Sequence, residues 1–340
     1  MAENELKGMD EVFVNDIGET EAEFTDDLKK KKIKRIILFL VVLILVVAIV
    51  VAIILLVKKD DDKKDEEKDE TTILMKNEDF IKPKNTKKEY QLVKLKNSEY
   101  KFILVHDPYT AIGGLEIKTN LGFLTEFEDG FAHYAEHIFS GGTENVTKLD
   151  IYHLMDQFQL FANAYTWEDE TVFQYFGSNL TYNTLLEYIS SFIQKPALNK
   201  TFLKSEIDVI TSEHDLYNHS SLNYYDIYKE HSNPDHPFYK SKTGNIGNKE
   251  SLDCFTADEL AEKLLNYYRI LFKPENSVFL LYSSKSFKEM RLLAQKYFDF
   301  KLPEPTEEYN KKYNDIKLAL EKPLFLEGSL GNIASFNNLR

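Results

Sequence analysis

The segment His133-Tyr134-Ala135-Glu136-His137 constrains this chain most, because its spacing only has chemical meaning on a helix. Residues four apart lie above one another on an α-helix, so the ring nitrogens of His133 and His137 can reach one metal ion. Glu136 lies three residues after His133 on the same face. A carboxylate there can take a proton from a bound water without being a ligand itself. The segment therefore predicts a metal site on a helix.

The pattern is the inverted zinc motif H-x-x-E-H, and a catalytic zinc takes three protein ligands and a water. A five-residue match is weak alone, and a helix that carries two histidines without a metal is the alternative. The flanks favour the motif, since Asp129–Ala132 is typical of a helix start and Gly141–Thr143 of a helix stop. The two histidines still need a third ligand from elsewhere in the chain.

A second helix offers carboxylates for that purpose. Ser205–His214 has an amphipathic pattern, and Glu206 and Glu213 are seven residues apart, which places them on one face.

Together these segments give the chain a resemblance to a known family, the pitrilysin/insulinase zinc metallopeptidases. The resemblance covers roughly residues 90–320 and is closest to the insulin-degrading enzyme branch. The segments that carry it, in the family's order and spacing, are Asp129–Thr143, Asn163–Thr166, Glu206–His214, Asn233–Phe238 and Thr243–Asn245.

The resemblance implies one zinc ion as cofactor. It implies His133, His137 and Glu213 as the zinc ligands and Glu136 as the general base. Glu206 then resembles the carboxylate that orients a metal-bound imidazole.

The resemblance also implies that a substrate peptide binds as an added strand along Asn163–Thr166, with Asn163 and Ala164 contacting its backbone. The alternative for Asn163 is an ordinary strand-end residue. The chain departs from the family just before this segment, where relatives have small glycines and this chain has Gln159–Ala162. Family members also close their active site with a second homologous half. The resemblance extends only over the N-terminal catalytic domain, so a homologous half or a second copy is an expected partner.

Composition narrows the function classes. The formal net charge is −14, which argues against a nucleic-acid partner, because neutralising phosphates needs a basic surface. Hydrophobic residues make up 43% of the chain, enough for a buried core. The single cysteine excludes an intramolecular disulfide framework.

An uninterrupted apolar run of 22 residues at 36–57 predicts a transmembrane helix. At 1.5 Å per residue it spans about 33 Å. Six Lys or Arg within residues 29–35 predict that the tail at 1–35 is cytoplasmic and that the rest is extracellular or luminal. The opposite orientation stays open. Four glycosylation sequons, all after the run, agree with the first orientation: Asn145, Asn179, Asn199 and Asn218.

Beyond this anchor, residues 58–89 are predicted to be a charged stalk, and residues 90–304 the catalytic domain. Residues 305–340 are predicted to be a linker and the start of an incomplete second domain. Strands are predicted at 90–93, 100–105, 111–119, 163–166, 171–176 and 277–282, and helices at 130–140, 148–158, 181–194, 200–218, 256–269 and 285–297. Their order indicates an α+β fold, with helices packed on a mixed, largely antiparallel sheet.

The sequence thus predicts a membrane-anchored zinc metalloendopeptidase that acts on unfolded peptides. One alternative is a membrane-tethered subunit that binds peptides but does not cleave them, or that needs the second half. Another is a peptide sink whose zinc is structural.

Overall fold

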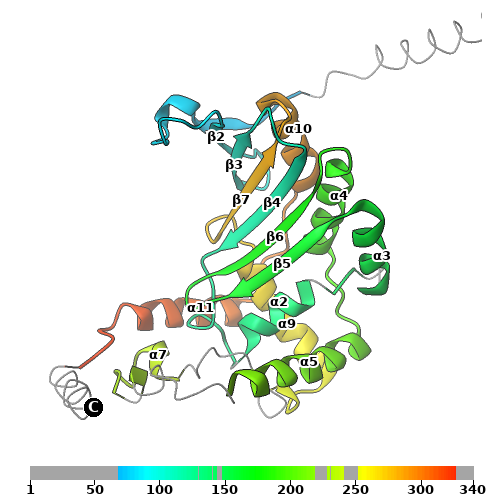
Figure 1. Ribbon diagram of the computed structural model, residues 1–340. Coiled ribbons are helices and arrows are strands. Elements are labelled where there is room, and N and C mark those ends of the chain that lie inside the picture. Colours follow the sequence, from blue (N-terminus) through cyan, green and yellow to red (C-terminus); the bar gives the residue numbers. More distant parts are fainter. Residues whose placement is uncertain are drawn as a thin grey trace, which may run out of the picture. The chain divides into compact units, whose positions relative to one another are not determined.

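A computed structural model describes residues 68–128, 130–139, 141–143, 148–218, 228–229, 231–240 and 252–326 (Figure 1). The predicted tail at 1–35, the predicted anchor at 36–57 and residues 58–67 of the predicted stalk lie outside these ranges. Among the helices within the described ranges, none is both long enough and apolar enough to cross a bilayer.

A seven-stranded sheet organises the described part of the chain (Figure 1). In spatial order its strands are β1 (Thr72–Met75), β2 (Glu89–Lys94), β3 (Lys101–His106), β7 (Ser277–Ser283), β4 (Ile112–Thr119), β6 (Thr171–Ser178) and β5 (Phe161–Thr166). The β3–β7 pair is parallel and the other five pairs are antiparallel. The predicted mixed, largely antiparallel sheet is confirmed, and β5 forms one of its edges.

Eight α-helices accompany the sheet within the described residues. They are α2 (Phe131–Phe139), α3 (Lys148–Phe158), α4 (Tyr182–Gln194), α5 (Lys200–Asn218), α7 (Pro237–Lys240), α9 (Ala257–Leu271), α10 (Phe287–Phe298) and α11 (Glu307–Leu320). A short 3-10 helix, η1, spans Asn77–Asp79. The six predicted helices are all present, which confirms the α+β class.

The core lies between the sheet and these helices. Along β4, Leu115 and Ile117 are fully buried while Glu116 between them is partly exposed, because successive strand residues point to opposite faces. α4 and α10 contact the buried face, and the Phe298 ring of α10 packs at a tilt against the Phe102 ring of β3, with centroids 5.5 Å apart.

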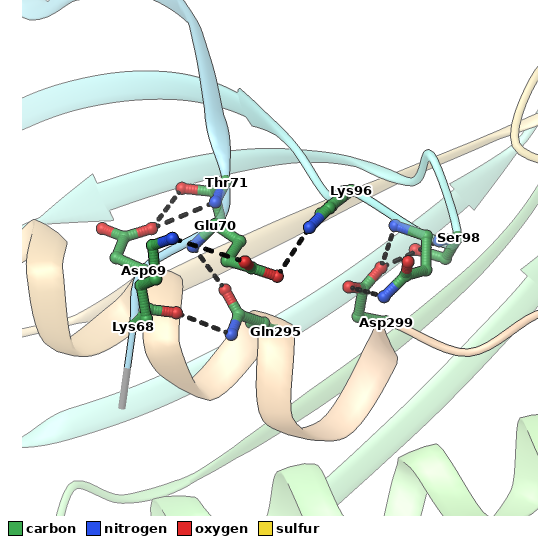
Figure 2. A network of polar contacts seen from close by, with 9 residues as sticks. Lys68, Asp69, Glu70, Thr71, Lys96, Ser98, Gln295 and Asp299 are labelled. Atoms are coloured by element: carbon green, nitrogen blue, oxygen red, sulfur yellow. Dashed lines mark hydrogen bonds and ion pairs between the residues drawn. The ribbon is translucent and has the colours of Figure 1, made fainter. Parts of the chain in front are cut away.

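The segment that leads into β1 is held on α10, as Figure 2 shows. The Glu70 backbone N–H donates to Gln295 Oε1 at 2.8 Å, and Gln295 Nε2 donates to the Lys68 carbonyl at 3.0 Å. Arg291 Nε donates to Asp69 Oδ2 at 2.7 Å. The end of α10 holds a second loop in the same way, since Asp299 Oδ1 accepts the backbone N–H groups of residues 97 and 98 at 2.8 Å each. We call these contacts, together with the Lys96–Glu70 ion pair, the α10 clamp.

The α10 clamp and β1 change the predicted boundary of the stalk. Residues 68–89 were expected to be a solvated spacer, but Thr72–Met75 pairs with β2 and residues 68–71 are bonded to α10. The apolar stretch of β1, Ile73–Met75, is only three residues long. The charged residues on both sides of it make the segment as a whole typical of a solvated spacer.

The predicted linker at residue 305 is also different in the structure. Residues 307–320 form α11, which packs against α9. Tyr309 and Tyr313 are buried, and the Tyr313 hydroxyl donates to Asn276 Oδ1 at 3.0 Å. The proline-containing segment before α11 predicts a domain boundary. Instead, the buried side chains of Tyr309 and Tyr313 attach α11 to the predicted catalytic domain. Residues 327–340, predicted to begin a second domain, lie outside the described ranges.

Candidate metal centre

The start of α2 is fixed by a carboxylate. Glu126 accepts hydrogen bonds from the backbone N–H groups of Gly130 at 3.1 Å and Ala132 at 3.0 Å. Gly130 has a φ of 86°, a left-handed conformation that glycine adopts without strain. The N–H groups at a helix start have no partners within the helix, and a negative charge there also matches the helix dipole. These contacts set where the following turn presents His133 and His137.

The far end of α2 lies directly against α5. A Cβ atom at Gly141 would lie 1.8 Å from the Phe202 ring, so only glycine permits this approach. The Tyr134 hydroxyl donates to the Leu203 carbonyl at 2.5 Å and ties the same two helices together. This packing carries the acidic face of α5 to the histidine face of α2.

The structure brings the three predicted ligands together. Glu213 Oε2 lies 3.4 Å from His133 Nε2 and 3.5 Å from His137 Nε2. One donor atom from each residue lies within 4.8 Å of the other two. In a tetrahedral site with bonds of about 2.0–2.1 Å, donor atoms are about 3.3 Å apart. The donor set therefore has the chemistry and the spacing to hold a single cation.

Glu206 lies beside one of these donors. Its Oε2 lies 3.2 Å from His137 Nδ1, and its side chain is 3% exposed. In the neutral form of His137, Nδ1–H donates to Glu206 and the Nε2 lone pair is left for a metal ion. Burial lowers the pKa of His137, but the hydrogen bonds with Glu206 and Glu213 outweigh it and raise the pKa to about 9. The His137 imidazole thus has a carboxylate at each of its two ring nitrogens.

Glu136 lies beside the donors but outside their group. It is 8% exposed, and its Oε2 accepts a hydrogen bond from the Thr166 hydroxyl at 2.6 Å. Burial raises the pKa of Glu136, against the lowering effects of Thr166 and His137. A carboxylate of raised pKa next to a metal site is suited to proton transfer near neutral pH. Thr166 belongs to the segment that resembles the family but had no predicted role; its place at the end of the edge strand was the available signal.

The predicted substrate residues lie on β5 at the edge of the sheet. Asn163 is exposed and Ala164 is partly buried against the core. Ala164 shares a strand face with Thr166, which reaches α2, while Asn163 points to the opposite face. The structure therefore places the Ala164 side chain, but not the Asn163 side chain, on the strand face that Thr166 shares with the metal centre.

The departure from the family before β5 has a structural explanation. Gln159 has a φ of 51°, in the left-handed region that glycine adopts most easily. Leu160 finds room because β6 has a glycine opposite it: a Cβ at Gly177 would lie 2.5 Å from a Leu160 methyl. The Leu160 side chain is therefore packed against β6 and the core.

Comparisons with known proteins agree with this geometry. Residues 101–231 match the family described as Insulinase (Peptidase family M16). The A-factor-processing enzyme of Saccharomyces cerevisiae is 26% identical over 200 residues, which cover 57% of this chain and 19% of that protein. The insulin-degrading enzyme of Mus musculus is 23% identical over 225 residues, covering 65% and 22%.

The crystal structure of pitrilysin has a TM-score of 0.59 at 20% identity and covers 70% of this chain and 26% of that one, which shows a shared fold. The chain spans about a fifth of the length of the two curated relatives. Residues 101–231 of this chain, which contain His133, Glu136, His137, Glu206 and Glu213, therefore form a domain of the insulinase family, peptidase family M16.

Proposed function

We propose that this chain is a membrane-anchored zinc metalloendopeptidase that hydrolyses peptide bonds in unfolded peptides. The observation that carries the proposal is the convergence of His133, His137 and Glu213, with Glu136 beside them as a carboxylate outside the donor group.

Zinc is the metal that fits this donor set. Two imidazole nitrogens and one carboxylate oxygen are a common set of three protein ligands for a catalytic zinc. Bound there, zinc would lower the pKa of a water and polarise a peptide carbonyl. Glu206 would hold the tautomer and the orientation of His137.

The chain's own residues then have distinct roles. Glu136 accepts a proton from the attacking water and returns it to the leaving amine. The raised pKa of Glu136 favours both transfers, because the carboxylate is neither too weak a base nor too weak an acid. The Thr166 hydroxyl fixes the position of the Glu136 carboxylate and ties it to the edge strand.

A peptide would bind along β5. An edge strand presents unpaired backbone groups. An extended peptide can pair with them largely independently of its sequence. Trp167 N–H donates to Glu170 O, and hydrogen bonding alternates along an antiparallel ladder, so Ala162, Ala164 and Thr166 direct their backbone groups outward. Contacts to the Ala164 backbone would place the substrate next to Glu136, and the exposed Asn163 would contact it from the other face.

The relatives are much longer than this chain, which favours a need for a further domain. Because this chain covers about a fifth of its curated relatives, we also propose that full activity needs a second homologous half, from a partner or from a second copy. A subunit that only binds peptides is the competing function, and it predicts peptide binding without cleavage under every condition.

Anchoring is proposed through residues 36–57, with the N-terminus cytoplasmic and the catalytic domain extracellular or luminal. The sequons give a test. Asn199 is exposed, whereas the Asn179 side-chain amide already donates to Thr110 O and Ser284 Oγ. In cells that glycosylate, Asn199→Gln should remove a glycosidase-sensitive mobility shift that Asn179→Gln leaves in place. A chain with no such shift at any sequon would contradict the luminal topology.

The first test of the activity is hydrolysis of a quenched-fluorescent peptide by the full chain, with and without a zinc chelator. We expect cleavage that the chelator abolishes and added zinc restores. Cleavage that survives removal of the metal would refute the zinc mechanism. Binding without cleavage, even with the chain concentrated enough to self-associate, would favour the peptide-binding alternative.

A further inference from the structure

An apolar cavity lies beside the start of β5, away from the metal centre. Its volume is about 160 Å³. α3, α4 and the end of α2 enclose it together with β5, and Figure 1 shows α3 and α4 next to this end of the strand. Side chains that line it include Phe139, Tyr152, Met155, Leu160, Ala162 and Tyr188.

The cavity opens at the surface rather than inside the core. Tyr152 is 56% exposed and Phe161, which also lines the cavity, is 58% exposed. Deeper lining residues are buried or packed against the core, among them Phe139 and Met155. An apolar cavity of about 150 Å³ is large enough for benzene. This one therefore has room for one large apolar side chain.

The register of β5 connects this cavity to a bound peptide. Ala162, Ala164 and Thr166 share one face, because strand residues alternate. Thr166 contacts Glu136 at the metal centre, while Ala162 lines the cavity. A residue paired directly opposite Ala162 would point its side chain to the same face, beside the cavity mouth.

The direction of the peptide follows from the neighbouring strands. β4, β6 and β5 are antiparallel to one another, and antiparallel pairing is the more stable kind, so an added strand is expected to run against β5. Its residue opposite Ala162 then comes four positions after the residue opposite Thr166. The side chain at the cavity is therefore C-terminal to the bond next to Glu136.

We propose that this cavity is a specificity pocket for an aromatic or large aliphatic side chain, about two to four residues C-terminal to the cleaved bond. The proposal rests on the proposed function and deepens it: the substrates are extended peptides with an apolar residue at that place. Leu160 and Phe161 form part of the wall.

The test uses a set of peptides that carry one phenylalanine at successive positions in an otherwise polar sequence. Full chain is incubated with each peptide, and the products are identified by mass. We expect the cleaved bond to move with the phenylalanine and to stay two to four residues before it. Replacing that phenylalanine by serine should lower kcat/KM about tenfold, from the burial of one aromatic side chain.

Variants then locate the effect. Ala162→Leu fills the cavity, and Tyr152→Ala removes an exposed part of its rim; each should bring the phenylalanine-to-serine ratio close to one. Tyr109→Ala is the matched control, because Tyr109 is 75% exposed and does not line the cavity. It should leave the ratio unchanged. Since Tyr152 is at the surface, its variant tests the pocket even if Ala162→Leu fails to fold.

A second readout separates this inference from the proposed function. Fluorescence anisotropy measures binding of the same peptides to the Glu136→Gln chain, so it does not need cleavage. A tenfold preference for phenylalanine that Tyr152→Ala removes supports the pocket even if the chain cleaves nothing. Metal-dependent cleavage without any phenylalanine preference, or equal binding of both peptides, overturns the pocket and leaves the peptidase proposal standing.

Discussion

Two polar networks in this domain use the same residue types in different ways. At the metal centre, the carboxylates Glu136, Glu206 and Glu213 gather around two imidazoles. At the α10 clamp, the Glu70 carboxylate pairs with Lys96 and the Asp299 carboxylate accepts backbone N–H groups (Figure 2). The Asp69 carboxylate pairs with Arg291.

The difference lies in burial and charge balance. The clamp carboxylates are half-exposed and are matched by full cations or by donors, so the network is satisfied as it stands. Two of the metal-centre carboxylates, Glu136 and Glu206, are more buried than those of the clamp. Burial lowers the pKa of His137, but its hydrogen bonds with Glu206 and Glu213 outweigh this and raise the pKa to about 9. Bringing negative charge together out of water is costly unless a cation balances it. The comparison separates a network that stabilises the fold from one that is arranged for a bound cation.

The sharpest way to test this contrast is to neutralise one carboxylate in each network. Glu136→Gln should lower peptide cleavage by about a hundred- to ten-thousand-fold while zinc content stays the same, because it removes the proton acceptor but no ligand. Asp299→Asn at the clamp is the control and should retain activity. Zinc content by atomic absorption and cleavage rate are measured on the same sample. Substantial cleavage by Glu136→Gln would remove Glu136 from the role of general base.

Acidity should weaken the binding of zinc at the metal centre. A metal-bound imidazole must be neutral, so below pH 9 a proton on His137 competes with zinc. The apparent affinity should therefore fall about tenfold for each pH unit below 9. The folded-state pKa is raised above 6.5, so in the metal-free chain the protonated His137 stabilises the fold below pH 6.5, and this contribution is lost as pH rises through 9.

Competition with a chelating dye between pH 6.5 and 9.5 measures the affinity. A flat profile would show that His137 is not protonated in the metal-free state.

The residue that orients His137 should have a smaller effect. Glu206→Gln keeps the size of the side chain but removes the charge, and zinc affinity should fall about tenfold. Thermal unfolding of the metal-free variant serves as the control for folding. If zinc affinity is unchanged while Glu136→Gln behaves as expected, Glu206 only fills space between α2 and α5.

The clamp should influence stability and not catalysis. Asp299→Ala removes the acceptor for the N–H groups of residues 97 and 98, and we expect a loss of about 1–2 kcal/mol in the free energy of unfolding. Zinc affinity and kcat/KM of the folded protein should not change. A variant with normal stability but altered cleavage would mean that the two networks are coupled. The clamp would then contribute to catalysis and not only to the stability of the fold.

Local patterns in the sequence predicted most of the elements. The hairpin β2–β3, the helix α2 and the edge strand β5 all follow from periodicity and from turn residues, and the structure confirms each. The stalk and linker boundaries failed for one shared reason. β1 and α11 contain few apolar residues in a regular pattern. Their positions are fixed by contacts with residues far away in the sequence, Lys94 and Asn276 among them.

The sequence by itself determined the half of the metal centre that lies on one helix. A spacing of three and four residues places Glu136, His133 and His137 together on any regular α-helix, because the helix has 3.6 residues per turn. Only the tertiary structure decided the rest. It brought Glu213 within 3.5 Å of both imidazoles, Thr166 onto Glu136, and the cavity beside Ala162. Those placements depend on packing between distant segments, such as Gly141 against Phe202, and such contacts leave no periodic trace in the sequence.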